Sequence, residues 1–252
     1  MVNQNLSERE RDILALLARD SGFSVAQMSA ELGVSTVTIR SRLNGLARKG
    51  IIMRSRGGAS LAFHPEVIVR QGLKVAEKSR IAQAAASLIR NGDTIMIEAG
   101  TTTSLVAKFL LGKRDIHLVT NSTLILPYAR TNPALQLTVV GGFFRPATES
   151  MVGPLALEAL GRFHVRLAFV GTDGFSPEGG LTTHLLEGAE IVRRMAERAV
   201  RTVLVADSSK YGHLGFVEVL PMTEVDTLVS DTGLPEETVR QCREAGLEVI
   251  LV

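Results

Sequence analysis

The sequence predicts an α/β protein in two unequal parts: a small, mainly helical N-terminal part and a larger part built on a mainly parallel sheet. Amphipathic helices and a short hairpin fill the first sixty residues, whereas short apolar segments alternate with helical ones in the remainder. The chain has 252 residues, of which 45% are hydrophobic and 21% charged. These values are typical of a globular chain with one large domain or two unequal ones.

Three helix starts are recognisable in the first part, each marked by a serine that can cap free backbone N–H groups: Ser7, Ser24 and Ser35. The first two serines are followed three residues later by Glu or Gln, which is the spacing of a capping box. Gly33 separates the second helix from a third, predicted over about residues 36–49. Two short helices joined by a tight turn, with another helix before them, are typical of a helix-turn-helix.

A short hairpin is predicted after the third helix. Residues 51–56 and 59–63 form its strands, and Gly57–Gly58 suits the tight turn between them. Residues 33–64 contain six Lys and Arg but no Asp or Glu. Residues 1–60 carry nine basic against five acidic side chains, whereas residues 61–252 carry nineteen against twenty-one. A local basic surface built on a helix attracts double-stranded DNA, because neutralising phosphates releases counterions.

The third helix is expected to enter the major groove, with the hairpin as a wing beside it. The side chains predicted to contact DNA are Ser35, Thr36, Thr38, Arg40, Ser41, Arg42, Asn44, Arg54 and Arg56. Arg40 can bind a guanine edge or a phosphate, and the sequence leaves both open. The alternative is a small helical interaction domain with a solvated basic face. The caps, the turn, the hairpin and the missing acids together favour DNA binding.

A linker is expected at residues 64–73, where Pro65 and Gly72 interrupt the pattern, between a part of residues 1–63 and a part of residues 74–252. A helix is predicted over residues 74–90. The strands predicted after it are residues 94–97, 116–120, 135–140, 165–170, 202–206, 227–230 and 248–252. Strands that are apolar throughout and separated by helices indicate a Rossmann-like, mainly parallel sheet covered on both faces.

Loops rich in Gly, Thr and Ser follow five of these strands. The carboxyl ends of parallel strands meet at one edge of a sheet, where ligands bind. Glycine lets backbone N–H groups approach an anion, and hydroxyls add donors. Residues 100–104 are therefore predicted to bind a phosphate, with Lys210 and Arg145 as countercharges. The loop matches neither the P-loop nor the G-x-G-x-x-G pattern, so nucleoside triphosphates and dinucleotides are poor candidates.

The residues predicted to bind this ligand are Glu98, Gly100, Thr101, Thr102, Thr103, Asn121, Ser122, Gly142, Arg145, Gly171, Asp173, Gly174 and Lys210. The carboxylates and the amide among them can bind hydroxyls. The set therefore fits a phosphorylated sugar or polyol. The alternative is that these loops are only tight turns and helix caps.

Cys242 is the only cysteine, which excludes an intrachain disulfide and a thiolate metal cluster. The five histidines lack metal-ligand spacing, so neither a metal nor a cofactor is expected. The polar first residues and the lack of an apolar run of about 20 residues predict a cytoplasmic protein without a membrane span. Most of the nine phenylalanines are expected in the core, but Phe143 and Phe144, beside Gly142, have the alternative of lining a pocket or a subunit interface.

The sequence resembles the DeoR family of bacterial transcriptional regulators along nearly its whole length. The motifs that carry the resemblance include Val34-Ser35, Thr38-Ile39-Arg40, Arg56-Gly57-Gly58-Ala59, Glu98-Ala99-Gly100-Thr101-Thr102, Val119-Thr120-Asn121-Ser122, Gly141-Gly142 and Asp207-Ser208-Ser209-Lys210-Tyr211-Gly212. Their order and spacing together make it specific. The family usually has Arg-Asp where this chain has Ser41-Arg42, which puts the base preference in doubt.

The resemblance implies a winged helix-turn-helix and a sensor domain similar to ribose-5-phosphate isomerase. It also implies a dimer or tetramer whose operator affinity changes when a phosphorylated sugar or polyol binds. We therefore expect a regulator, in the first instance a repressor of a sugar or polyol operon, rather than an enzyme. The alternative is a sugar-phosphate isomerase with an accessory DNA-binding head. Its general acid and base would come from Glu98, Asp173, Asp207 and Lys210.

Overall fold

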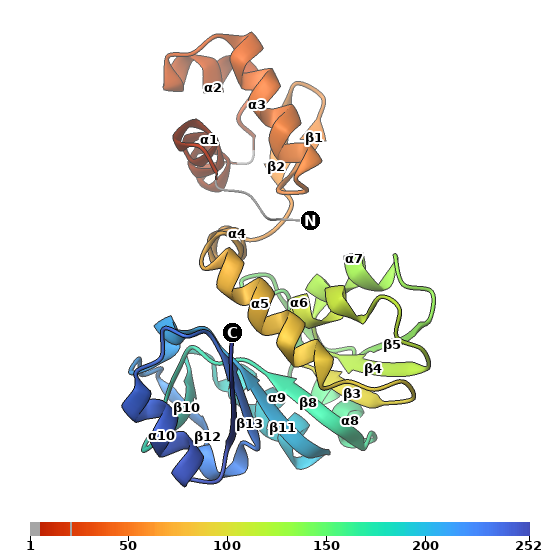
Figure 1. Ribbon diagram of the computed structural model, residues 1–252. Helices are drawn as coiled ribbons and strands as arrows, with labels where there is room; N and C mark the ends of the chain where they lie inside the picture. Colours follow the sequence, from red (N-terminus) through yellow and green to blue (C-terminus); the bar gives the residue numbers. More distant parts are fainter. Residues whose placement is uncertain (1–5, 21) are drawn as a thin grey trace. The chain divides into compact units, whose positions relative to one another are not determined.

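The computed structural model describes residues 6–20 and 22–252 (Figure 1). The chain divides into two compact units: Met1–Val75 with Pro146–Thr148, and Ala76–Arg145 with Glu149–Val252. We call them the smaller and the larger unit. In the described part of the chain, no helix combines the length and the apolar character needed to cross a bilayer.

The smaller unit contains the predicted helix-turn-helix. Its elements are α1 (Glu8–Arg19), α2 (Val25–Leu32), α3 (Thr36–Arg48), β1 (Ile52–Ser55), β2 (Gly58–Leu61) and α4 (Pro65–Gly72). Both capping boxes form, and the side chain of Ser35 accepts from the backbone N–H of Thr38. Gly33 ends α2 in the left-handed conformation, with φ of 63°. Glycine adopts this conformation without the strain that a Cβ would cause.

One local expectation for this unit was wrong. The hairpin turn lies at Arg56–Gly57 rather than at Gly57–Gly58, because Gly58 already pairs with Ser55 in the ladder. Gly58 is in the strand for a packing reason: a Cβ there would lie 2.9 Å from the carbonyl oxygen of Phe23. The segment 64–73, which the sequence predicts to connect the two parts, is mostly the helix α4. Pro65 starts that helix, a position where its missing N–H costs nothing.

An ion pair joins the first and third helices of the smaller unit. Lys49 Nζ lies 2.7 Å from Glu10 Oε1, and both side chains are largely buried. Burial alone would raise the pKa of Glu10, but hydrogen bonds from Lys49 and Ser7 and the charge of Lys49 hold that pKa below its ordinary value. Lys49, one of the six cations in the basic segment, therefore holds the helices together.

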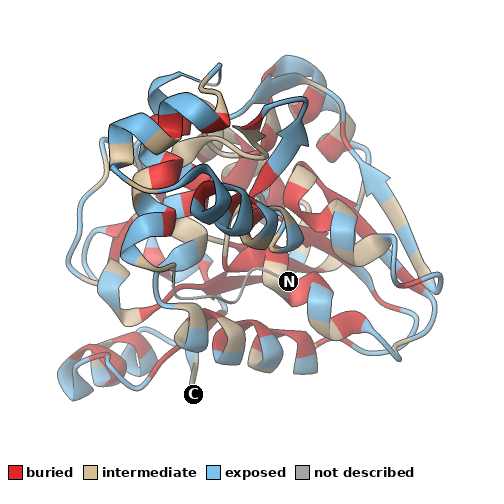
Figure 2. Cartoon of the chain, turned by 90° about the horizontal axis from the view of Figure 1, so that it is seen from above, coloured by how far each residue is buried: buried red, intermediate tan, exposed pale blue. Residues whose placement is uncertain are grey.

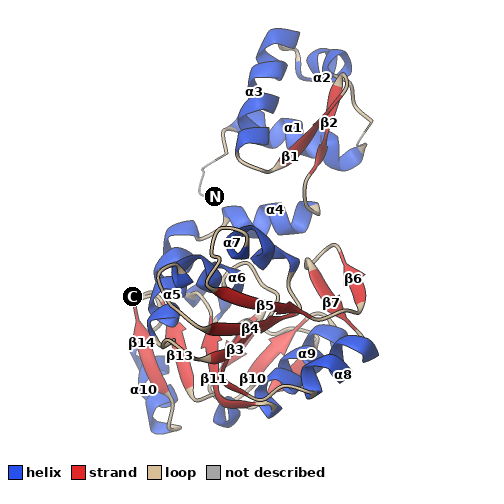
Figure 3. Cartoon of the chain, turned by 90° about the vertical axis from the view of Figure 1, so that its right-hand side faces the viewer, coloured by secondary structure: helices blue, strands red, loops and turns tan. Residues whose placement is uncertain are grey.

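The larger unit is built on a seven-stranded sheet in the order β14-β13-β11-β8-β3-β4-β5, and every neighbouring pair is parallel (Figure 3). All seven predicted strands are present: β3 (Thr94–Ile97), β4 (Ile116–Thr120), β5 (Leu135–Val139), β8 (Val165–Val170), β11 (Ala199–Val205), β13 (Thr227–Ser230) and β14 (Glu248–Leu251). The predicted α/β fold with a mainly parallel sheet is therefore confirmed.

Helices precede the first strand of this sheet and connect the later ones. They are α5 (Val75–Ser87), α6 (Thr103–Val106), η1 (Ala107–Leu110), η2 (Thr123–Ile125), α7 (Leu126–Ala129), α8 (Pro154–Gly161), α9 (Leu186–Glu197), η3 (Ser208–Lys210), η4 (Met222–Glu224) and α10 (Glu236–Glu244). The longer helices bury one side and expose the other, as the alternating colours of Figure 2 show.

Two small antiparallel elements were not expected from the sequence. One is the hairpin of β6 (Phe143–Arg145) and β7 (Ser150–Val152). The other is a sheet of β9 (Gly174–Ser176), β10 (Gly180–Thr183) and β12 (Val217–Leu220) in the order β12-β10-β9. Their strands are three or four residues long, and β12 pairs with a strand more than thirty residues away. Neither feature leaves a local signal in the sequence.

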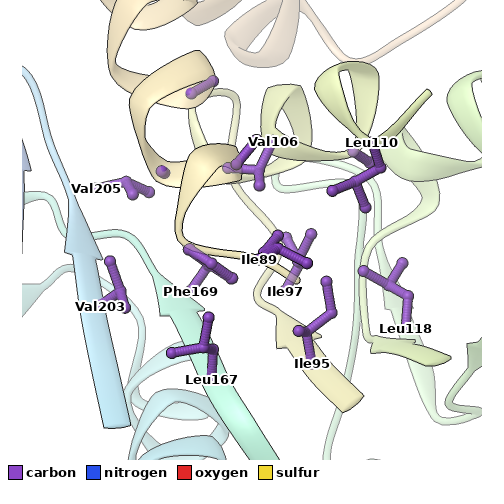
Figure 4. Close-up of a cluster of buried hydrophobic side chains, with 14 of the residues drawn as sticks. Ile89, Ile95, Ile97, Val106, Leu110, Leu118, Leu167, Phe169, Val203 and Val205 are labelled. Carbon is purple, nitrogen blue, oxygen red and sulfur yellow. The ribbon is translucent and has the colours of Figure 1, made fainter. Parts of the chain in front are cut away.

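The sheet is buried on both faces. In β3, Ile95 and Ile97 pack into one apolar cluster (Figure 4), whereas Met96, between them, packs into another. The neighbouring strand β8 repeats the pattern, with Phe169 on the first side and Ala168 on the second. Alternate residues of one strand point to opposite faces. These strands are therefore apolar throughout because both of their faces are covered.

We predict that Glu10→Gln lowers the free energy of unfolding by about 1–3 kcal/mol at neutral pH, because it leaves the largely buried Lys49 without its counterion. Glutamine keeps the capping box, so the change isolates the charge. The folded-state pKa of Glu10 is depressed, so the stabilisation is present above the unfolded pKa and is lost as pH falls through the folded one. Urea unfolding at several pH values measures both effects.

The control is Asp12→Asn, which removes the exposed pair with Arg9 on the same helix and should cost less than about 0.5 kcal/mol. A Glu10→Gln deficit that stays constant as the pH is lowered would contradict the assignment.

Candidate functional site

The predicted DNA-contacting side chains lie together on the exposed side of α3 and the hairpin. Ile39, Leu43 and Leu46 are buried, which fixes the inward face of α3. All of the predicted contacts are exposed: Ser35, Thr36, Thr38, Arg40, Ser41, Arg42, Asn44, Arg54 and Arg56. In the described residues, none of their four arginines takes part in an ion pair. This surface therefore keeps its positive charge available.

The turn before α3 is held by local hydrogen bonds. Ser29 Oγ donates to the carbonyl oxygen of Val34 over 2.5 Å. The hydroxyls of Ser35 and Thr38 lie 3.0 Å apart, and the Ser35 hydroxyl also caps α3. These two hydroxyls therefore have structural partners, unlike the guanidinium of Arg40. Val37, an expected outward residue of the same helix, is 72% exposed beside them and can meet a thymine methyl group.

The second group of predicted residues lies at the carboxyl edge of the seven-stranded sheet. β3 has β4 on one side and β8 on the other, so the chain changes direction across the sheet at this point. Ligands bind at such a switch point in open parallel sheets. Glu98 follows β3 and Gly171 follows β8, and the backbone N–H of Gly171 donates to Glu98 Oε2 over 3.2 Å. The fold thus brings these two predicted residues into contact.

The glycine-threonine loop after β3 is compact. Thr103 Oγ1 donates to the carbonyl oxygen of Gly100 over 3.0 Å, and the backbone N–H of Ser104 donates to the same oxygen. A Cβ on Gly100 would lie 2.8 Å from Thr103 Oγ1, which explains the glycine. The helix that the loop opens, α6, is only four residues long. Hydroxyls and individual N–H groups therefore matter more here than a helix dipole.

Asn121 and Ser122, which follow β4, hold this loop in place. Asn121 Oδ1 accepts from the backbone N–H of Ala99 over 2.9 Å, and its Nδ2 donates to the carbonyl oxygen of Met151 over 3.1 Å. Ser122 Oγ lies 3.1 Å from Ser104 Oγ. Both side chains are buried. Their contacts give them a positioning role.

Lys78 of α5 is a site residue that the sequence analysis missed. Its side chain is 6% exposed, and Nζ lies 3.3 Å from Thr101 Oγ1. It is the only buried Lys or Arg among the residues that the structure describes. A usable signal was present, since Lys78 precedes Ile81 and Ala82 by three and four residues and so lies on the apolar stripe of the helix.

Two of the predicted polar residues contact the segment between β10 and α9. Asp173 Oδ2 accepts from Thr183 Oγ1 over 2.8 Å and from the backbone N–H of His184 over 3.0 Å. Arg145 forms an ion pair with Glu187. The pKa of the Glu187 carboxyl group is lowered, because the carboxylate accepts a hydrogen bond from the backbone N–H of Glu187 itself and another from Arg145. Arg145 is therefore already partly neutralised.

The remaining predicted residues include two glycines that packing explains. A Cβ on Gly174 would lie 2.0 Å from the carbonyl oxygen of His213, and one on Gly142 would lie 2.6 Å from that of Val152. Lys210 ends the short helix η3, and its side chain is half-buried. Thr102, the residue before α6, is also buried.

Two family descriptions match the chain. Residues 9–63 match the DeoR-like helix-turn-helix domain, and residues 73–232 match the DeoR C terminal sensor domain. The chain belongs to the DeoR family. This DeoR-family chain is therefore a transcriptional regulator that binds DNA through its helix-turn-helix and carries an effector-binding sensor domain.

Known proteins resemble the DeoR-family chain over most of its length. It is 33% identical over 252 residues to a putative aga operon transcriptional repressor of Escherichia coli O157:H7, covering 98% of this chain and 94% of that protein. It is 29% identical over 248 residues to a glycerol-3-phosphate regulon repressor of Haemophilus influenzae, covering 97% and 96%. These relatives are regulators, so the enzyme alternative is not supported.

Among solved structures, the DeoR-family chain is similar to ribose 5-phosphate isomerase A from Methanocaldococcus jannaschii. The sequence identity is 18%, the similarity covers 53% of each chain, and the TM-score is 0.39.

We predict that Arg40→Ala weakens binding to the chain's own upstream DNA by roughly ten- to a hundredfold, because an arginine contact on a recognition helix is worth about 1–3 kcal/mol. Arg54→Ala on the hairpin should instead lower the slope of log affinity against log salt by about one. Fluorescence anisotropy over a salt series measures both quantities.

The control is Arg9→Ala, which removes an exposed arginine of α1 that pairs with Asp12. Wild-type affinity and an unchanged salt slope in the Arg40 and Arg54 variants would show that DNA is bound elsewhere.

Proposed function

We propose that this regulator represses a sugar or polyol catabolic operon and is controlled by a phosphorylated sugar or polyol bound at the carboxyl edge of the larger unit's sheet. The observation that carries the proposal is the buried Lys78 beside Thr101 in the Gly100–Ser104 loop. A buried ammonium group beside the hydroxyls and backbone N–H groups of this loop suits a phosphate. Charge-assisted hydrogen bonds are roughly twice as strong as neutral ones.

The ligand's hydroxyls would bind the carboxylates that flank this loop. Glu98 lies directly before the loop, at the switch point beside Gly171. Asp173 follows the neighbouring strand β8, and its Oδ2 already accepts hydrogen bonds from a hydroxyl and an N–H. A polyhydroxylated ligand offers donors of the same kind. The name of the Haemophilus relative supports the same class of ligand, because glycerol-3-phosphate is a phosphorylated polyol.

Control requires the ligand to prefer one of two conformations of the protein. A ligand with equal affinity for both would not change the binding of DNA. Lys78 lies on the first turn of α5, and the division between the two units falls at Val75, where that helix begins. A phosphate that attracts the ammonium group of Lys78 would act on α5. This helix directly follows the smaller unit in the sequence.

We further propose that three consecutive segments of the chain have different functions. Residues 1–63 bind DNA, residues 64–73 connect, and residues 74–252 sense the effector. The protein would act as a dimer or tetramer, since paired recognition helices read two half-sites about one helical turn apart. The partners are therefore operator DNA, the effector and further copies of the same chain.

We predict that a thermal-shift screen separates phosphorylated sugars and polyols from their unphosphorylated counterparts. A ligand at a hundred times its Kd adds about 2.7 kcal/mol. For a unit of this size that raises Tm by roughly 5–10 °C. Each phosphorylated compound is paired with its parent sugar or polyol as the control. Stabilisation by the parent alone would contradict the role of the phosphate.

We predict that Lys78→Met weakens the binding of the phosphorylated ligand by roughly ten- to a hundredfold, since a hydrogen bond to a charged group contributes about 1.5–3 kcal/mol. Operator affinity without ligand should stay unchanged. Calorimetric titration measures the first quantity and anisotropy the second. Lys108→Met is the matched control, because Lys108 is exposed on the same unit. Equal ligand affinity in the Lys78 and Lys108 variants would remove Lys78 from the site.

A further inference from the structure

The larger unit exposes several large apolar side chains in one region. Phe216 is 89% exposed and Phe143 is 69% exposed. We call the region the apolar face, and its members are Phe143, Leu155, Leu185, Leu186, Leu214 and Phe216. Single exposed apolar residues are ordinary, but a continuous apolar area of several hundred Å² marks a binding surface.

Contacts of β6 bring the first half of this face together. The Phe143 ring lies against the turn that starts α8, since a Cβ on Gly153 would be 2.8 Å from it. Leu155 is the second residue of that helix. Phe143 and Arg145 lie on the same side of β6, because alternate residues point the same way. Arg145 pairs with Glu187 in the first turn of α9. The starts of α8 and α9 therefore both lie beside β6.

The loop before β12 supplies the second half of the face. The backbone N–H of Gly215 donates to Thr182 Oγ1 over 2.8 Å, and a Cβ on Gly215 would lie 2.6 Å from backbone atoms of Thr183. Gly215 stands between Leu214 and Phe216. This contact places both apolar side chains beside the end of β10, two residues before Leu185 and the start of α9.

The area of the face is large for the surface of a monomer. With roughly 200 Å² per phenylalanine, Phe143 and Phe216 alone expose about 300 Å². The four leucines add a comparable area. Together they approach the central part of a standard protein interface, which buries about 800 Å² on each partner.

The charges around the face favour a second copy of this chain as the partner. Arg145 pairs with Glu187 beside Phe143, and Arg162 pairs with Glu158 on α8. Each pair is neutral, so two identical faces can meet without repulsion between like charges. Like charges placed opposite each other across an interface cost several kcal/mol. The ion pairs within each copy avoid this cost.

We propose that the apolar face is the surface through which two copies of this chain associate. This extends the oligomer of the proposed function by assigning its contact surface. Among the alternatives for Phe143, it assigns the subunit interface, since the side chain is too exposed for the core. Phe216 and Phe143 would form the centre of the interface, since exposed aromatic side chains are enriched there.

The test is the molar mass of the full chain by light scattering at tens of micromolar, with neither DNA nor ligand. The wild-type mass should be a multiple of 27.1 kDa. Phe216→Arg and, separately, Leu155→Arg should reduce it to half or less while the circular dichroism spectrum stays unchanged. Val200→Arg is the matched control, because Val200 is 78% exposed on β11 outside the face. That variant should keep the wild-type mass.

Three results would overturn the proposal: a wild-type monomer, a wild-type mass in both face variants, or an equal loss of mass in the Val200 variant. Phe216 and Leu155 lie in separate segments of the chain. If the variant at one of these positions does not fold, the variant at the other position still tests the proposal. The mass is measured without DNA or effector. A negative result therefore leaves the proposed sensing of a phosphorylated ligand untouched.

Discussion

Burial of both faces of the parallel sheet is the constraint on which the larger unit depends. Parallel strands cannot be joined by tight turns, so each connection must cross a face of the sheet and cover it. The alternation of Ile95, Met96 and Ile97 between two separate clusters shows that both faces are covered. The same constraint places every strand's carboxyl end at one edge. Loops after β3, β4 and β8, distant in sequence, therefore become neighbours.

The polar residues at that edge divide into those that hold the loops and those that remain for a ligand. A buried polar group without a partner costs about 1–3 kcal/mol, so the loops must satisfy their own groups first. Asn121 and Ser122 do this for the loop after β3, and Asp207 caps η3. Lys78 differs, because burying a cation is costly and its Nζ lies beside Thr101 in the loop after β3. A buried lysine at a ligand-binding edge is therefore the feature most in need of a functional reason.

Local signals predicted most of the fold, and non-local contacts account for what was missed. Ser7, Ser24 and Ser35 identified three helix starts because capping depends on residues three positions apart. The predicted DNA contacts are all exposed because the buried stripe of α3 fixes its outer face. The hairpin turn was misplaced since the reason for Gly58 lies at Phe23, far away in sequence.

The sensor site shows the same division. The strands and the glycine-threonine loops that follow them were predictable, and Glu98 and Gly171 do meet. Arg145 was predicted as a countercharge without its partner, because Glu187 is forty-two residues away. Lys78 was missed because apolar residues alone mark the buried side of an amphipathic helix in a sequence. A buried lysine on that side depends on a partner elsewhere in the chain, here Thr101.

The segment from Thr183 to Glu187 connects the two surfaces proposed for the larger unit. At one end Asp173 accepts from Thr183 and His184, and at the other Glu187 pairs with Arg145 of β6. Leu185 and Leu186, between these anchors, belong to the apolar face. A ligand hydroxyl that competes for Asp173 would loosen the first anchor. The position of the two leucines, and with it the fit of a second copy, would change as a direct consequence. Sensing and association would then be coupled through five consecutive residues, without any rearrangement of the sheet beneath them.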